Sequence, residues 1–141
     1  EVLAKQHYET VEAMFRKYDV PFCAVLVTGS PREIVENVMA QAPKGAFVGY
    51  VCGNDDVTPK PDPAPYWRAA SMVGLPADAS GAGQCLVFED SKPGLTADRA
   101  SGATVVAVTG HARVDMSDSG LCDEAIVDYR GLTIADLAGW M

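Results

Sequence analysis

Apolar residues along this chain follow two alternating patterns. Around residues 11–18 they recur at i, i+3, i+4 and i+7, which is typical of one face of an amphipathic helix. Residues 22–27 then form an unbroken apolar run of strand length, as expected for a strand that is covered on both faces. The same succession of helix and buried strand repeats toward the C-terminus, so the pattern predicts an alternating α/β chain.

The polar residues between these runs indicate where each element begins and ends. Ser30, Pro31 and Glu33 stand at the Ncap, N1 and N3 positions of a capping box, which predicts a helix from there to about residue 42. Further strands are expected at 46–52, 84–88 and 103–108, with a short apolar piece at 125–127. Further helices are expected at 62–74, 92–101 and 134–140, and loops at 53–61, 75–83 and 109–124.

Alternation of helices with buried strands predicts parallel strands joined by crossover helices, and hence a three-layer α/β domain. In such sheets, ligands bind beyond the carboxyl ends of the strands, where the loops gather. Three polar groups fall at these ends, namely Thr28-Gly29-Ser30, Lys60 and Glu89-Asp90. We therefore expect these groups to lie close together.

Composition narrows the class of protein. The 141 residues are 48% hydrophobic and 21% charged, which favours one folded domain over residues 1–141. The 11 Lys and Arg against 19 Asp and Glu give a net charge of −8, which argues against nucleic acid as a partner. The chain shows neither an apolar run near the roughly 20 residues of a membrane span nor a leader pattern, so we expect no membrane association.

Cysteine usage points to a reducing compartment. The four cysteines are Cys23, Cys52, Cys85 and Cys122, and their spacing forms no C-x-x-C pair that would grip a metal or carry out redox chemistry. Three of them lie within apolar runs, as buried free thiols do. This usage predicts a cytoplasmic protein.

The loop Thr28-Gly29-Ser30 has the features of a phosphate cradle. It lies between a buried strand and a helix start, where hydroxyls, unpaired amides and the helix dipole all favour an anion. Gly29 would let a ligand approach the backbone closely. The alternative is that Ser30 is merely a helix cap and Thr28 a strand end.

Lys60 and the pair Glu89-Asp90 complete the candidate chemistry. The prolines around Lys60 stiffen the backbone, so the ammonium could serve as a fixed charge for a phosphate oxygen, although most lysines are simply solvated. The two carboxylates suit Mg²⁺, although acidic residues are also common near helix N-termini. An anion cradle, a positive charge and a metal site are together what phosphoryl transfer needs.

At these positions the chain resembles the haloacid dehalogenase-like (HAD) hydrolase superfamily, in its branch of sugar phosphatases and β-phosphoglucomutase-like enzymes. Residues 26–30 resemble the second family motif, whose Thr or Ser binds the transferring phosphoryl group. Lys60 in the run Lys60-Pro61-Asp62-Pro63 resembles the third, and residues 87–94 resemble the fourth, whose acidic pair holds Mg²⁺. The resemblance implies catalytic and phosphate-binding roles for Thr28 and Lys60, phosphate binding by Gly29 and Ser30, and metal binding by Glu89 and Asp90.

One family motif has no counterpart in residues 1–141. The first motif is an Asp-x-Asp on the central strand of the sheet, which supplies the nucleophile, and this sequence contains no Asp-x-Asp. The resemblance therefore implies the C-terminal part of a Rossmann-like HAD core that lacks its first, central strand and its cap domain. The missing strand would leave two neighbouring strands with unpaired backbone groups.

The expected function is that of a Mg²⁺-dependent phosphatase acting on a sugar phosphate or another small phosphorylated metabolite, present here as a chain inactive by itself. The missing N-terminal segment, supplied as a separate chain, is a further expected partner. The alternative is a non-catalytic module that binds phosphometabolites without a nucleophile. A dinucleotide-binding domain is disfavoured because no G-x-G-x-x-G follows any predicted strand.

Overall fold

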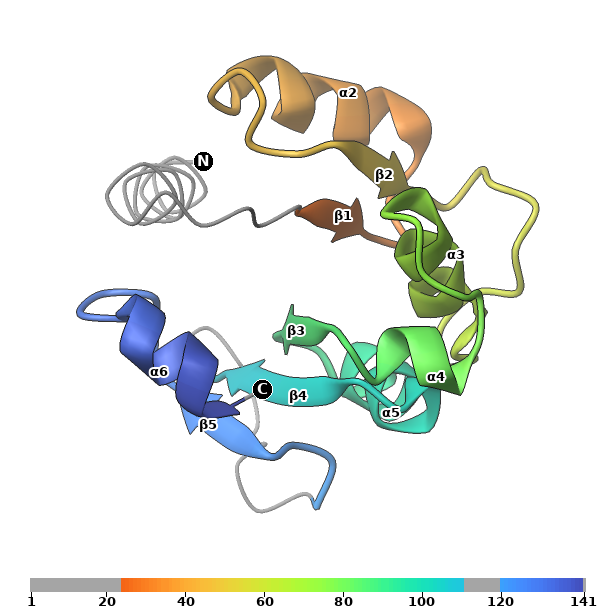
Figure 1. Cartoon of the computed structure of the whole chain (residues 1–141). Helices are drawn as coiled ribbons and strands as arrows, with labels where there is room; N and C mark the ends of the chain where they lie inside the picture. Colours follow the sequence, from red (N-terminus) through yellow and green to blue (C-terminus); the bar gives the residue numbers. More distant parts are fainter. Residues whose placement is uncertain (1–23, 111–119, 141) are drawn as a thin grey trace.

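A computed structural model describes residues 24–110 and 120–140 of the chain, and within them helices and parallel strands alternate (Figure 1). The strands are β1 (Val25–Val27), β2 (Gly49–Val51), β3 (Leu86–Glu89), β4 (Thr104–Val108) and β5 (Glu124–Ile126). The helices are α2 (Arg32–Gln41), α3 (Ala64–Met72), α4 (Ala79–Ala82), α5 (Lys92–Ser101) and α6 (Ile134–Trp140). The predicted α/β class is confirmed.

The described strands form two separate parallel sheets. One has the order β1-β2, with Leu26 opposite Tyr50, and the other has the order β3-β4-β5, with Val87 opposite Val105. In Figure 1, β1 lies above β3, and no described strand is drawn between them. Within residues 24–110 and 120–140, no strand pairs with the other edge of β1 or of β3.

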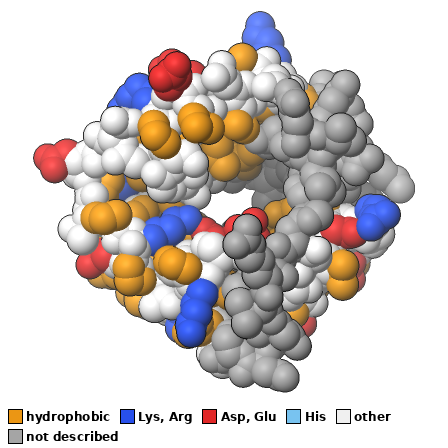
Figure 2. All heavy atoms as spheres, turned by 180° about the vertical axis from the view of Figure 1, so that it is seen from behind, with side chains coloured by type: hydrophobic (Ala, Val, Ile, Leu, Met, Phe, Trp, Pro, Cys, Tyr) orange, Lys and Arg blue, Asp and Glu red, His pale blue; other side chains and the backbone are white. Residues whose placement is uncertain are grey.

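The direction of the backbone groups identifies these two free edges. Ala24 and Thr28 bond to β2, so the alternation of a parallel ladder turns the N–H and C=O of Val25 and Val27 away from β2. Cys85 accepts from Thr104 of β4, so Leu86 and Phe88 likewise face away from β4. Seen from behind, the molecule has a central opening with hydrophobic side chains along its upper rim and charged ones along its lower rim (Figure 2).

Helix α5 has the boundaries that the sequence predicts. Ser91 caps it, since its hydroxyl accepts a hydrogen bond from the N–H of Gly94 at 3.2 Å. Gly102 ends it with φ = 94°, a left-handed conformation that glycine adopts without steric cost. The same helix covers the second sheet, where Leu95 packs against Val105 and Ala107 in a fully buried cluster.

The predicted capping box at the start of α2 is wrong. Pro31 is the residue that precedes the helix, and no side chain of the box bonds to its first turn. The hydroxyl of Thr28 instead accepts from the N–H of Ser30, at 3.1 Å, so these residues form a turn rather than a cap. The N–H of Arg32 is satisfied from outside by Asn54 Oδ1 at 2.7 Å.

Other boundaries differ from the prediction in smaller ways. The segment 75–83, predicted as a loop, contains the short helix α4, which Asp78 caps by accepting from the N–H groups of Ser80 and Gly81. β1 and β2 each have three residues, fewer than their apolar runs suggested. The predicted first helix at 11–18 and Cys23 lie outside the described residues, and Cys52 and Cys85 are free thiols.

Helix α3 joins the two halves of the fold. It packs against β1 and β2 on one side and against α4 and α5 on the other. The indole N–H of Trp67 donates to the carbonyl of Ser101 on α5 at 3.1 Å, and Tyr66 is buried at 4% exposure. None of the helices described here is long and apolar enough to cross a membrane.

Candidate functional site

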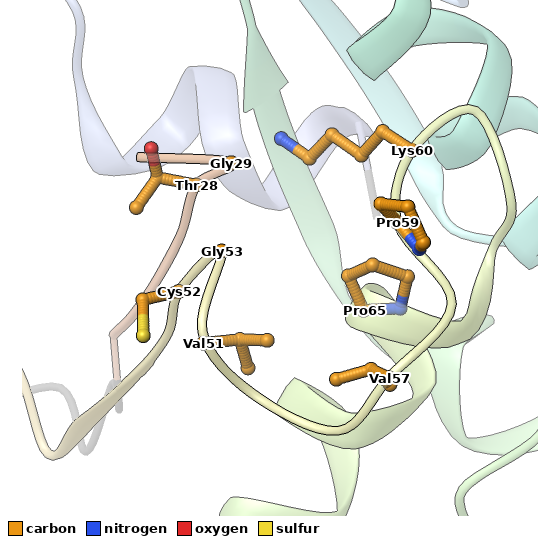
Figure 3. Close-up of a pocket in the computed structure, with 9 residues that line it drawn as sticks. All are labelled: Thr28, Gly29, Val51, Cys52, Gly53, Val57, Pro59, Lys60 and Pro65. Carbon is orange, nitrogen blue, oxygen red and sulfur yellow. The ribbon is translucent and has the colours of Figure 1, made fainter. Parts of the chain in front are cut away.

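The carboxyl ends of β1, β2 and β3 bring the predicted site residues together. Thr28 and Gly29 follow β1, Lys60 lies in the loop between β2 and α3, and Glu89 is the last residue of β3, with Asp90 directly after it. Thr28, Gly29 and Lys60 line one pocket, whose remaining walls come mostly from the loop after β2 (Figure 3). Ser30 is absent from this lining. Glu89 and Asp90 join the site through Lys60 and the end of β3 rather than through the pocket wall.

The Thr28 hydroxyl is oriented by its own turn. Its oxygen accepts from the N–H of Ser30, so its hydrogen is left to donate to a ligand. Gly29 is exposed, and a Cβ placed on it would meet no protein atom within 4 Å. A phosphoryl oxygen could therefore approach the backbone at Gly29 and accept a hydrogen bond from Thr28.

Lys60 spans the space between the two sheets. Its ammonium donates to the carbonyl of Val27, at the free edge of β1, with Nζ and O 3.2 Å apart. It also forms an ion pair with the carboxylate of Glu89 at the end of β3, and its Nζ lies 5.1 Å from the centroid of the Tyr66 ring. Only 15% of the Lys60 side chain is exposed, so its charge is held in place and largely desolvated.

Glu89 is the buried anchor for this lysine. At 8% exposure it accepts a hydrogen bond from the Tyr66 hydroxyl at 2.6 Å, from Asp90 N at 3.1 Å and from Ser91 Oγ at 3.3 Å. A Cβ on Gly94 would lie 2.1 Å from Glu89 Oε2, so the glycine makes room for the carboxylate against α5. Burial, reinforced by the charge of Glu89, raises the pKa of Tyr66, which keeps its phenol protonated as a donor.

The two members of the acidic pair have different surroundings. The Glu89 carboxylate is engaged by Lys60 and Tyr66, whereas Asp90 is exposed. Among residues 24–110 and 120–140, no group of three or more His, Cys, Asp or Glu side chains forms a protein-only metal cage. Mg²⁺ usually takes one or two carboxylates and completes its shell with water and substrate phosphate, so Asp90 fits such an ion with Glu89 behind it.

Sequence reasoning missed three residues that shape the site. Tyr66 is buried in the core, yet its hydroxyl also donates a hydrogen bond to Glu89. Asp55 bonds both to Arg32 of α2 and to the backbone of Cys52. Asp98, one helical turn after Gly94, is fully buried and no described group bonds to its carboxylate oxygens. The only available signal was for Asp98, a charged residue on the apolar face of a predicted helix.

Substitution by alanine should have unequal effects at two glycines of the site, Gly53 and Gly29. A Cβ on Gly53 would lie 2.3 Å from the carbonyl oxygen of Gly29, a backbone atom that cannot yield cheaply. We expect Gly53→Ala to lower the free energy of unfolding by about 1–3 kcal/mol, the usual cost of overpacking. Gly29→Ala, with open space around its Cβ, should change it by less than about 0.5 kcal/mol. Urea unfolding of both variants measures the difference, and equal losses would contradict the close packing of the two loops.

The fold and the site together define an α/β domain with a pocket, lined by Thr28, Gly29 and Lys60, at the carboxyl ends of its parallel strands. No family model matches the chain. The probable pseudouridine-5'-phosphatase of Drosophila melanogaster is 42% identical over 94 residues, covering 63% of this chain and 38% of that protein. The protein CbbY of Rhodobacter capsulatus is 36% identical over 85 residues, covering 57% of this chain and 35% of that protein.

A solved structure extends the likeness to the fold. A HAD hydrolase of family IA, variant 3, from Entamoeba histolytica HM-1:IMSS superposes with a TM-score of 0.72 over 94% of this chain and 57% of that one, at 22% identity. These curated relatives and the shared fold support the resemblance to the HAD-like hydrolase superfamily. It spans well under half of the length of the curated relatives that it matches.

Proposed function

We propose that this chain is the phosphate-binding part of a Mg²⁺-dependent phosphatase that hydrolyses a sugar phosphate or another small phosphomonoester. The observation that carries the proposal is the convergence of Thr28, Gly29 and Lys60 on one pocket, with Lys60 fixed by buried Glu89. The curated relatives support the reaction class, since one is named as a pseudouridine-5'-phosphatase. Another, from Saccharomyces cerevisiae (strain ATCC 204508 / S288c), is named glycerol-1-phosphate phosphohydrolase 1, at 24% identity over 62% of this chain and 36% of that protein.

Each residue of the site has a distinct part in this reaction. The Thr28 hydroxyl and the backbone at Gly29 bind phosphoryl oxygens, with Ser30 shaping the turn behind them. The ammonium of Lys60 neutralises the charge that builds up on the phosphoryl group. Asp90, with Glu89 behind it, would hold Mg²⁺, which when bound lowers the charge repulsion between nucleophile and phosphate.

Residues 1–141 contain no Asp-x-Asp, so we propose that the nucleophile comes from another segment. We propose that this segment carries an Asp-x-Asp strand and pairs with the free edges of β1 and β3. Its first carboxylate would attack phosphorus, and the ester oxygen would leave with a proton from the second. Water would then hydrolyse the aspartyl phosphate, releasing inorganic phosphate and restoring the carboxylate.

The Lys60 contact to Val27 supports that placement. Val27 turns its carbonyl to the free edge of β1, and Lys60 already bonds there while it pairs with Glu89 at the end of β3. A strand between β1 and β3 would pair with the backbone groups of Val25, Leu86 and Phe88, which face the same space. Such a strand would end beside Lys60, the position at which an attacking carboxylate is needed.

An assay of the complemented chain tests the proposal. The chain is mixed with a separate segment carrying an Asp-x-Asp strand, and hydrolysis of an aryl phosphate is followed with Mg²⁺ present. We expect activity only in the mixture, and a loss of about 10²-fold or more in Asp90→Ala. Asp136→Ala, an exposed carboxylate on α6, serves as the control for charge. A folded mixture without activity would overturn the proposal.

The absence of Asp-x-Asp from this sequence favours one second candidate, a module that binds phosphometabolites without turning them over. That candidate predicts inorganic phosphate binding by calorimetry and no hydrolysis in any mixture. Both candidates would work in a reducing, cytoplasmic setting, which the free thiols of Cys52 and Cys85 support.

A further inference from the structure

We propose that Asp55 is a positioning residue which, through Arg32, holds the loop after β2 against the loop after β1 and so sets the spacing of Thr28 and Lys60. The inference rests on the proposed function, because it concerns how the same phosphate pocket is kept in shape. Neither Asp55 nor Arg32 lines the pocket. Their effect on a ligand is therefore indirect, through the two loops that carry the lining residues.

The two loops touch backbone to backbone. The N–H of Gly53 donates to the carbonyl of Ser30 at 2.8 Å, and the Gly53 Cα lies so close to Gly29 that a Cβ has no room. The loop after β2 then continues past Val57 and Pro59, which both line the pocket, to Lys60. The backbone position of Lys60 therefore depends on the packing of residues 53–55 against Thr28-Gly29-Ser30.

Asp55 connects the two loops through hydrogen bonds to both of its carboxylate oxygens. Oδ1 accepts from Arg32 Nη2 at 2.8 Å, and Oδ2 accepts from the N–H of Cys52 at 2.9 Å. The pKa of Asp55 is held below its usual value, first by the Cys52 N–H and also by the Arg32 guanidinium. One carboxylate therefore links the end of β2 to the first residue of α2.

Arg32 is itself fixed at three points. Its N–H donates to Asn54 Oδ1 at 2.7 Å, so a residue of the β2 loop caps α2. Its Nη1 donates to the Tyr50 hydroxyl at 3.2 Å, and its guanidinium carbon lies 5.8 Å from the centroid of the Tyr50 ring. Arg32, Asp55, Asn54 and Tyr50 form one connected group, which we call the loop clasp. A network of this kind holds geometry better than a single surface ion pair does.

Because Asp55 is negatively charged, the direction in which phosphate affinity changes on its substitution tests the proposal. Removing a negative charge near an anion site strengthens anion binding when only long-range electrostatics acts. If Asp55 positions the loops, Asp55→Asn should weaken binding instead, because the clasp loosens. The neighbouring Asp56 is exposed and offers a matched control, since Asp56→Asn makes the same change of charge one residue away without touching the clasp.

The experiment measures inorganic phosphate binding to the whole chain by NMR titration, together with amide exchange at Gly53 and Arg32. We expect Asp55→Asn to weaken phosphate affinity about tenfold or more and to speed exchange of both amides, as loss of preorganisation does. Asp56→Asn should leave exchange unchanged and affinity equal or slightly higher. Circular dichroism on each variant confirms that it is folded at the temperature of the titration.

Other outcomes separate this proposal from the proposed function. No phosphate binding by the unsubstituted chain would contradict the phosphate site, while faster exchange in Asp55→Asn would still support the clasp. Unchanged exchange and unchanged or stronger binding in Asp55→Asn would overturn the positioning role. Should Asp55→Asn fail to fold, Arg32→Lys takes its place: it keeps the charge but loses the forked contact to Asp55 and Tyr50, and the same weakening is expected.

Discussion

Replacing Lys60 by Met destabilises the folded chain by about 3–5 kcal/mol, because it leaves the buried carboxylate of Glu89 without its cation. The ion pair has side-chain exposures of 15% for Lys60 and 8% for Glu89, so little water is available to take the place of the ammonium. The Tyr66 hydroxyl remains as a donor to Glu89, but one neutral hydrogen bond does not balance a buried charge. Urea unfolding at neutral pH measures the loss.

A double variant and a surface control make this prediction specific. In Lys60→Met with Glu89→Gln, the buried charge is absent and the amide oxygen can still accept from Tyr66, so most of the stability should return. Lys92→Met removes an exposed lysine at the first residue of α5 and should change stability by less than about 0.5 kcal/mol. Equal losses in Lys60→Met and Lys92→Met would show that the ion pair contributes nothing to folding.

The second large effect is a gain in stability at alkaline pH when Asp98 is replaced by Asn. Burial, with a further contribution from the negative charge of Glu89, raises the pKa of Asp98 to about 8, while Lys60 and Arg99 act against this shift. Asp98 is fully buried and no described group bonds to its oxygens, so its ionised form is poorly stabilised.

The direction of the pH dependence follows from the raised pKa. In the unfolded chain Asp98 ionises near pH 4, whereas in the folded chain it holds its proton until about pH 8. Between these values the folded state binds more protons, so stability falls as the pH rises, by up to about 1.4 kcal/mol per pH unit. Above about pH 8 this dependence levels off.

Asp98→Asn cannot ionise and lacks that pH dependence. We therefore expect wild type and variant to have similar unfolding free energies near pH 4, and the variant to be the more stable one at pH 8. Urea unfolding at several values of pH measures the difference, with Asp56→Asn as the control on the surface. A difference between wild type and Asp98→Asn that stays constant across this range would mean that Asp98 is not held neutral.

The sequence predicts the boundaries of a helix correctly where residues of that segment itself determine its ends. Helix α5 is predicted to the residue, because Ser91 and Gly102 fix its two ends from within the segment. Helix α2 was placed well, but its cap was assigned to Ser30, whereas Asn54 from the next loop satisfies the N–H of Arg32. A partner 22 residues away leaves no local trace in the sequence.

The candidate site likewise has a part that the sequence predicts and a part that it does not. Thr28, Gly29 and Lys60 could be expected to meet, since parallel strands bring their carboxyl ends to one edge of the sheet, and they do meet in one pocket. The sequence also predicts that Lys60 lies close to Glu89, but the hydrogen bond from Tyr66 could not be foreseen, because Tyr66 lies on α3 and its position depends on how that helix packs. The residue types show that Glu89 and Asp90 both carry carboxylates. Only the fold shows that the Glu89 carboxylate is buried and that Asp90 is exposed.

The position of α3 has a consequence for how the chain unfolds. This helix packs against both strands of the first sheet and also against α4 and α5, which cover the second. Within the described residues, no backbone hydrogen bonds join the two sheets. Cooperative unfolding of the two sheets therefore depends on the packing of α3 and on the ion pair between Lys60 and Glu89. Weakening the Trp67 bond to Ser101 should therefore split a single unfolding transition into two, in which each half of the fold melts at its own temperature.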